Sequence, residues 1–218
     1  MKLWRDFYDL MMPDVPGCPS AAADSALRQS AIAFCEQSLA WQGTHPDVPV
    51  AAGAAEYAFT PPADAVVHAI IHAALDGEEI ALYPGEPGMG SKGMGGINRH
   101  GRKGIPAYIL ADTASLTFVP APGAPGMLSM TVAFKPSPAS TGIVDGQFSE
   151  YREAIVHGAL VRLMLSPKKP YSSTQLAQYH QQQFAVKTAA AGQRVARGHT
   201  RARLQTRIMA RGIAPGVR

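Results

Sequence analysis

The stretch YREAIVHGALVRLMLSPKKPYSS, residues 151–173, predicts two helices separated by a sharp break. Its first part carries an apolar stripe of helical period that stops at Pro167, and Pro170 prevents the helix from resuming at once. Ser172 or Ser173 can then cap the second helix. The first helix is expected over 147–166 with Phe148, Tyr151, Ile155, Ala159 and Leu163 facing the core. The second is expected over 172–197 with Leu176, His180, Phe184, Ala191 and Val195 on its buried side.

Two more helices are predicted toward the N-terminus. Residues 3–11 place apolar side chains at helical spacing until Pro13 stops the pattern. A longer helix is expected over 20–42, with Asp24 near its positive first turns and Gly43 offering the stop. The core-facing side chains would be Trp4, Phe7, Tyr8 and Met11 in the short helix, and Leu27, Ala31, Phe34, Ser38 and Trp41 in the long one.

The middle of the chain changes period. AVVHAIIHAALDGEEIALY, residues 65–83, can form a helix with His68 and His72 one turn apart, or a hairpin that turns at Asp76-Gly77. Its β-branched residues favour the hairpin. Two histidines four apart on a helix are a common zinc arrangement, but no third ligand or general base stands nearby, so we predict no metal site.

A second strand pair, 114–119 and 127–134, is expected to bracket the turn sequence PAPGAPG, which makes 55–135 a small antiparallel sheet with long loops. The predicted fold is α+β: a small helical bundle of the N-terminal helix and two C-terminal helices, an inserted antiparallel sheet, and a basic C-terminal strand or arm. The expected division is 1–50 for the N-terminal helices, 51–140 for the β-rich insertion, 141–198 for the C-terminal helices and 199–218 for the arm.

Composition limits the class of protein. The 218 residues suit one domain with an elaboration or two small ones, and with 46% hydrophobic and 17% charged residues the chain can bury a core. Cys18 and Cys35 lie outside any C-x-x-C pair and are expected to be free thiols. The N-terminus does not resemble a signal peptide, and no window approaches the ~18 apolar residues of a membrane span. We therefore expect a protein of the reducing cytoplasm with no membrane partner, at least until it joins an assembly.

Charge is divided unevenly along the chain. Residues 1–153 carry 9 basic and 16 acidic residues, net −7, whereas residues 154–218 carry 11 basic and no acidic ones, net +11. Such a split usually means that the basic segment meets something negative, either nucleic acid, an acidic membrane surface or an acidic protein partner.

The C-terminal segment 201–208 alternates strictly and is expected to form a strand that must find a sheet. Ala202, Leu204, Thr206 and Ile208 would share one face, while Arg201, Arg203 and Arg207 share the other. Such a strand suits β-augmentation of another chain, although it can also fold back onto its own sheet, and a solvated arm that aids solubility is the simpler alternative. The residues predicted to dock on a partner surface are Arg194, Arg197, Arg201, Arg203, Leu204, Arg207, Ile208 and Arg211.

No motif predicts an enzyme or a cofactor. Gly88-x-Gly90-x-x-Gly93 matches a dinucleotide fingerprint by letter, but it lies within a glycine-rich loop, 84–106, with no βαβ unit around it. Neither a nucleophile elbow nor a close carboxylate pair is present. The basic residues of this loop could instead touch a phosphate backbone or an acidic neighbour; they are Lys92, Arg99, Arg102 and Lys103.

Two blocks of sequence resemble the bacteriophage head-to-tail adaptor, or connector, proteins. The first is LWRDFYDLMMPDVPGCP (3–19) running into a helix that ends AFCEQSLAW (33–41). The second block consists of VAFKPSPAS (132–140), the two-helix stretch 151–173 and LAQYHQQQFAVKTAAA (176–191). The resemblance covers about half of the chain, at its two ends, and the strand region matches only in pattern. Departures are the glycine- and methionine-rich loop and Tyr171, where a tryptophan would be more familiar.

The resemblance implies a structural virion protein of the neck, assembled from the host cytoplasm and without enzymatic activity. Such adaptors form a ring, commonly twelvefold, beneath the portal, where they create the platform for the tail nozzle or tube protein and help to retain packaged DNA. In that reading the C-terminal arm grips the portal. A different hypothesis, drawn from the charge alone, is a nucleic-acid-binding protein that uses the arginine-rich arm.

Overall fold

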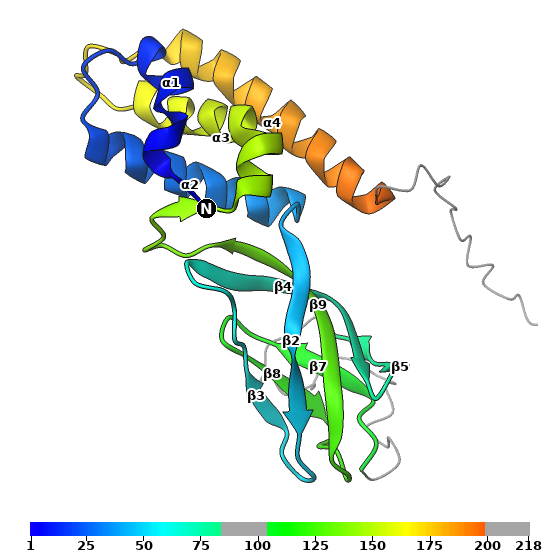
Figure 1. Cartoon of the computed structure of the whole chain (residues 1–218). Coiled ribbons are helices and arrows are strands. Elements are labelled where there is room, and N and C mark those ends of the chain that lie inside the picture. The colour runs from blue at the N-terminus through cyan, green and yellow to red at the C-terminus, as the bar shows by residue number, and fades with distance from the viewer. Residues whose placement is uncertain (84–103, 199–218) are drawn as a thin grey trace, which may run out of the picture.

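A computed structural model describes residues 1–83 and 104–198, and shows a helical part joined end to end with a β part (Figure 1). The helices are α1 (Tyr8–Met11), α2 (Ser20–Ser38), α3 (Asp145–Met164) and α4 (Thr174–Arg197), with short 3-10 turns at Trp4–Phe7 and Met12–Asp14. The mixed α+β class predicted from the sequence is confirmed.

The helical part has one core, in which α3 lies between α2 and α4 (Figure 1). Ile155 and Ala159 of α3 and Phe34 of α2 are fully buried, as the helical stripes predicted. Gly158 marks the point where three helices meet, because a Cβ added there would overlap the Ser30 hydroxyl of α2 and lie 2.8 Å from the ring of Phe184 of α4. The glycine therefore sets how closely the helices approach.

Helix α2 ends earlier than the sequence predicted. It stops at Ser38, because Leu39 adopts a left-handed conformation with φ 52° and its N–H closes back on the Cys35 carbonyl, 2.9 Å away. Trp41 follows the helix and packs against both hydrophobic cores. The expected stop, Gly43, lies in a strand, where an added Cβ would come within 3.1 Å of the Phe134 ring. Its glycine serves close packing instead of helix termination.

The β part consists of two four-stranded sheets that share a second core. The first sheet runs β2 (Gln42–Val50), β9 (Gly126–Pro136), β4 (Ala65–Leu75), β5 (Glu78–Glu79). The second runs β3 (Glu56–Ala58), β8 (Ser115–Val119), β7 (Tyr108–Ala111), β6 (Ala81–Leu82). A small pair, β1 (Lys2–Leu3) with β10 (Gly142–Ile143), ties the N-terminus to the start of α3.

The predicted hairpin is confirmed, and with it the strand reading of 65–75. β4 turns into β5 at Asp76 and Gly77, whose φ angles of 52° and 87° are those that a tight two-residue hairpin turn demands. The hairpin is short, since after Glu79 the chain leaves for the second sheet.

The predicted pairing of 114–119 with 127–134 is wrong. Both strands exist, but β8 pairs with β3 and β7, and β9 pairs with β2 and β4 in the other sheet. The connection between them thus passes from one sheet to the other, and the side chains of both strands meet in one core. The single antiparallel sheet expected over 55–135 is also wrong, because there are two sheets and β6 runs parallel to β7.

The two parts are held together at a polar joint as well as through Trp41. Lys135 of β9 donates to Glu36 of α2 at 2.6 Å, and Gln147 of α3 donates to the Ala40 carbonyl at 3.0 Å. These contacts join α2 and α3 of the helical part to the chain at the start of the β part.

Candidate docking surfaces

Helix α4 buries a narrow face made of small side chains. Ser173 caps it by accepting the Leu176 N–H, which settles the choice between the two predicted serines. Ala177, His180 and Ala191 are buried against α2 and α3. His180 and Ala191 were predicted here, whereas Phe184 and Val195 are half-buried and Leu176 is wrongly placed, because it is 49% exposed.

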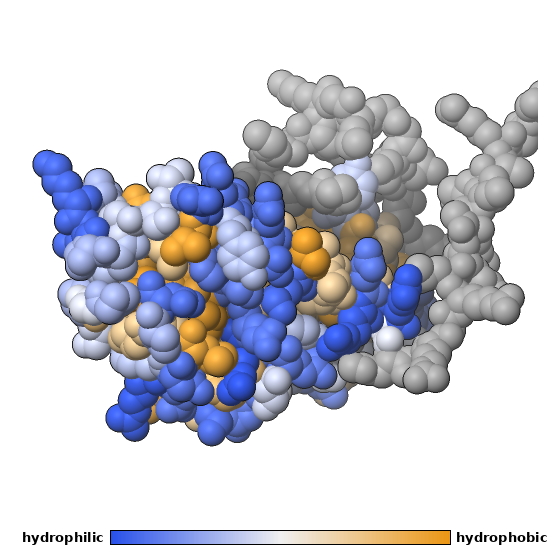
Figure 2. All heavy atoms as spheres, turned by 90° about the horizontal axis from the view of Figure 1, so that it is seen from above, coloured by the Kyte–Doolittle hydropathy of each residue, from blue (hydrophilic) through white to orange (hydrophobic). Residues whose placement is uncertain are grey.

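The exposed side of α4 carries an apolar ridge. Leu176, Tyr179 and Val186 are 49%, 52% and 65% exposed, which is unusual for side chains of this size. With Gln183 and Ala190 they are spaced alternately three and four residues apart, the spacing by which one helix packs along another. We call these five residues the α4 ridge. Seen from above the helices, apolar patches interrupt a largely hydrophilic surface (Figure 2).

The C-terminal end of α4 carries two of the predicted docking residues, Arg194 and Arg197, both exposed. The Arg194 guanidinium lies 5.9 Å from the centre of the Tyr151 ring and 3.7 Å from the Glu150 carboxylate, so its charge is partly engaged. The end of the helix borders a cleft of about 450 Å³ that also contacts Ala40 and Gln42 at the joint. The other predicted docking residues, Arg201 to Arg211, lie outside the described residues.

A histidine pair joins α3 to α4 beneath the ridge. The Nδ1 atoms of His157 and His180 are 2.8 Å apart, so one ring donates the proton that the other accepts. Burial lowers the pKa of His157, and the charges of His180 and Lys187 lower it further. Burial also lowers the pKa of His180, while Asp14 acts in the opposite direction on both rings. The pair therefore favours the neutral state in the folded protein.

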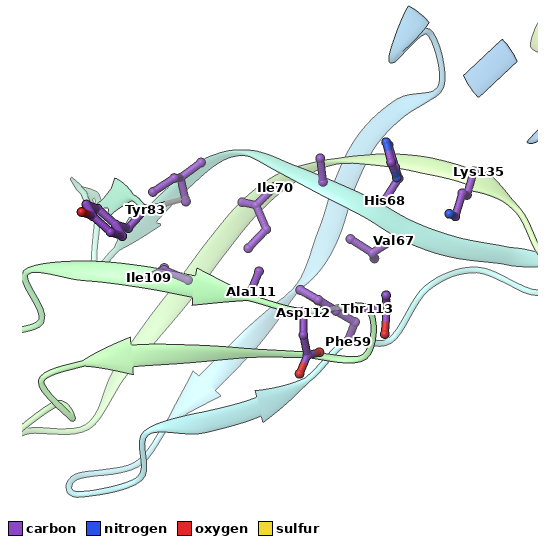
Figure 3. Close-up of a pocket in the computed structure, with 12 residues that line it drawn as sticks. Phe59, Val67, His68, Ile70, Tyr83, Ile109, Ala111, Asp112, Thr113 and Lys135 are labelled. Atoms are coloured by element: carbon purple, nitrogen blue, oxygen red, sulfur yellow. The ribbon is translucent and has the colours of Figure 1, made fainter. Parts of the chain in front are cut away.

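A cleft of about 630 Å³ lies between the two sheets of the β part (Figure 3). Val67 and Ile70 of β4 point into it from one side, and Ile109 and Ala111 of β7 line it from the other. At its rim Asp112 accepts the N–H groups of Ala114 and Ser115, both at 2.7 Å. These hydrogen bonds lower the pKa of Asp112, so a stable negative charge marks this end of the cleft.

The other candidate residues are not assembled into a site. His68 and His72 are both exposed on β4, and only His68 borders the cleft. Within 1–83 and 104–198, no three metal-binding side chains converge, and no helix is long and apolar enough to cross a membrane. The predicted loop contacts Lys92, Arg99, Arg102 and Lys103 lie outside the described residues, as does the Gly88–Gly93 pattern.

Charge separates between the β part and the C-terminus. The described β residues, 42–83 and 104–136, hold seven acidic residues against a single lysine, Lys135, which is paired with Glu36. Residues 199–218 hold five arginines and no acid. In the full sequence, residues 42–136 carry eight acidic and five basic residues, net −3, because four of the basic residues lie between 84 and 103. The acidic excess thus belongs to the described strands, and the basic excess belongs to the chain end.

Sequence reasoning predicted Arg194 and Arg197 of α4 as docking residues, but it did not predict the ridge or the cleft. The sequence did carry a signal for the ridge, because Tyr179 and Val186 belong to a second stripe with a spacing of three and four residues. On a helix whose first stripe is buried, such a second stripe indicates another packing surface. The cleft carried no such signal, since it forms between strands distant in sequence.

Comparison with known proteins supports the resemblance seen in the sequence. No curated protein matches the chain. The family model described as SU10 adaptor protein matches residues 8–211, which extends the likeness across the β part as well as both ends. This is a family of bacteriophage adaptor proteins, which implies a virion component that interacts with other structural proteins of the phage. The chain belongs to the SU10 adaptor protein family.

Proposed function

We propose that the protein forms an oligomeric ring of twelve copies between the portal and the tail in the neck of the virion. The observation that carries the proposal is the exposed α4 ridge, which leads directly into an acid-free, arginine-rich chain end. Large exposed apolar side chains at packing distance along one helix mark a surface that a partner covers.

Ring formation needs a contact between two different surfaces, because a self-complementary patch yields only a closed dimer. The acidic β part and the basic C-terminus supply two complementary surfaces on every copy. Opposite charges would also guide the encounter with the portal, whose surface the C-terminal arginines contact in this proposal. The tail protein would then bind the face of the ring away from the portal, with packaged DNA held near the channel.

The test compares two single substitutions on α4 in the full chain. Val186→Glu places a charge in the middle of the ridge, whereas Ala185→Glu places the same charge on a neighbouring exposed position outside it. We expect Val186→Glu to keep the wild-type melting temperature and to reduce recovery on portal rings in co-purification and particle imaging. Ala185→Glu should assemble like the wild type. Equal assembly of both variants would remove the ridge from the proposal.

DNA-binding measurements on the full chain test the alternative function, nucleic-acid binding through the arginine-rich arm. That alternative predicts an affinity for DNA whose logarithm falls steeply with the logarithm of salt concentration. Deletion of residues 199–218 should then weaken DNA binding, and an unchanged affinity would eliminate the alternative.

A further inference from the structure

Within the described residues, one edge of β4 has no strand partner over most of its length. β9 pairs with β4 from Ala65 to Leu75 along one edge. Along the other edge β5 pairs only at its last two residues, and the Ile80 N–H adds a bond to the Ala73 carbonyl at 3.0 Å. Among the described residues, none pairs with 65–72 on that edge. An eight-residue open edge is a template for another strand.

The cleft between the sheets lies beneath this edge. Val67 and Ile70 point from β4 toward β7, and the apolar side chains of Phe59, Leu82 and Ile109 complete the lining (Figure 3). Leu82 is 37% exposed. A strand added beside β4 would continue the first sheet over the cleft, and alternate side chains of that strand would point into it.

Residues 201–208 have the pattern that this site requires. Their apolar face, with Leu204 and Ile208, would point into the cleft, while Arg201, Arg203 and Arg207 would face outward. Eight extended residues span about 26 Å, the length of the open edge from 65 to 72.

The place where α4 ends favours a strand from a neighbouring copy over one from the same chain. Its last residues border a cleft with Ala40 and Gln42, at the start of β2. β2 and β4 lie on opposite sides of β9, so the open edge of β4 faces away from the point where the arm leaves its own chain. The three residues 198–200 can bridge only about 10 Å. The arm and the open edge thus lie on opposite sides of each copy. A contact between two such different surfaces is head-to-tail, and contacts of that kind can close into a ring.

We propose that residues 201–208 of one copy add as a strand to the open edge of β4 in the neighbouring copy and cover its cleft. This inference rests on the proposed function, because it requires copies that lie side by side in a ring. It adds that the exchanged strand forms the contact between neighbouring copies.

Photo-crosslinking of the full chain tests the exchange. A benzophenone amino acid replaces Leu204 in an unlabelled chain, which is mixed with ¹⁵N-labelled wild type and irradiated both free at high concentration and on portal rings. We expect crosslinks to labelled peptides of β4 or β7. Crosslinks only within the same chain would show that the arm folds back, and crosslinks only to the portal, to other surfaces or to nothing would equally overturn the proposal.

A matched pair of substitutions supplies the second readout. Leu204→Asp and Gln205→Asp add the same charge to opposite faces of the strand. Energy transfer between labelled chains measures the affinity of one copy for another. Leu204→Asp should lower this affinity about tenfold or more, and Gln205→Asp should lower it much less. Equal effects would overturn the strand exchange.

Portal binding by the wild type is measured separately. Exchange without portal binding would contradict only the proposed function, whereas portal-bound rings without exchange would contradict only this inference.

Discussion

Replacement of Gly158 by alanine tests the close packing of the three long helices. The added methyl group should raise the helix propensity of α3 by about 1 kcal/mol. Against this, the Cβ would overlap the Ser30 hydroxyl and lie 2.8 Å from the Phe184 ring, and such overpacking costs about 1–3 kcal/mol. Displacing Ser30 also disturbs its 2.6 Å hydrogen bond to the Ile155 carbonyl, at about 1 kcal/mol. The net expectation is a loss of about 1–3 kcal/mol in the free energy of unfolding.

Urea denaturation of the full chain measures this loss, and Gly146→Ala is the control on the same helix. A Cβ at Gly146 meets nothing within 4 Å, so that variant should equal or exceed the wild type by up to about 1 kcal/mol. The melting temperature should separate the two variants by several degrees. A Gly158→Ala variant as stable as Gly146→Ala would refute the close approach of α2, α3 and α4.

Three further predictions concern buried polar groups and a thiol. Because folding lowers the pKa of His157 and His180, the unfolded chain binds more protons below about pH 6.5; stability should therefore fall as the pH drops through that value, and His180→Gln should flatten the fall in denaturation curves recorded from pH 7.5 to 5.5. Trp4→Phe removes the buried 2.9 Å hydrogen bond from the indole to the Ser140 carbonyl, and should cost about 1–3 kcal/mol in the same assay. Burial raises the pKa of the Cys35 thiol to about 12, so iodoacetamide at pH 8 should leave Cys35 unmodified in the folded protein, as mass spectrometry would show.

Local patterns in the sequence were sufficient where a few adjacent residues decide the structure. Asp76-Gly77 supports positive φ at two successive positions, so the hairpin could be predicted from the turn alone. The stripe through Ile155 and Ala159 predicted the buried face of α3, because only a helix brings such residues together. The end of α2 could not be predicted, since Leu39 takes the left-handed conformation usually reserved for glycine.

Pairing between distant strands could not be predicted in the same way. β8 and β9 are neighbours in sequence, yet they pair with strands of two different sheets. In this arrangement the apolar faces of both strands pack into the core that the two sheets share. For the candidate surfaces, charge alone pointed to Arg194 and Arg197, which the structure places at the exposed end of α4. The ridge depends on which stripe of α4 is already buried, and that is decided by packing with other helices.

Mass photometry of the full chain, with and without its portal ring, tests the central claim most directly. The account predicts that the portal species gains a defined mass, close to twelve times the 23.1 kDa of the chain, and that particle imaging shows an added ring on one face of the portal. A portal whose mass is unchanged by the protein at physiological salt would contradict the proposed role in the neck.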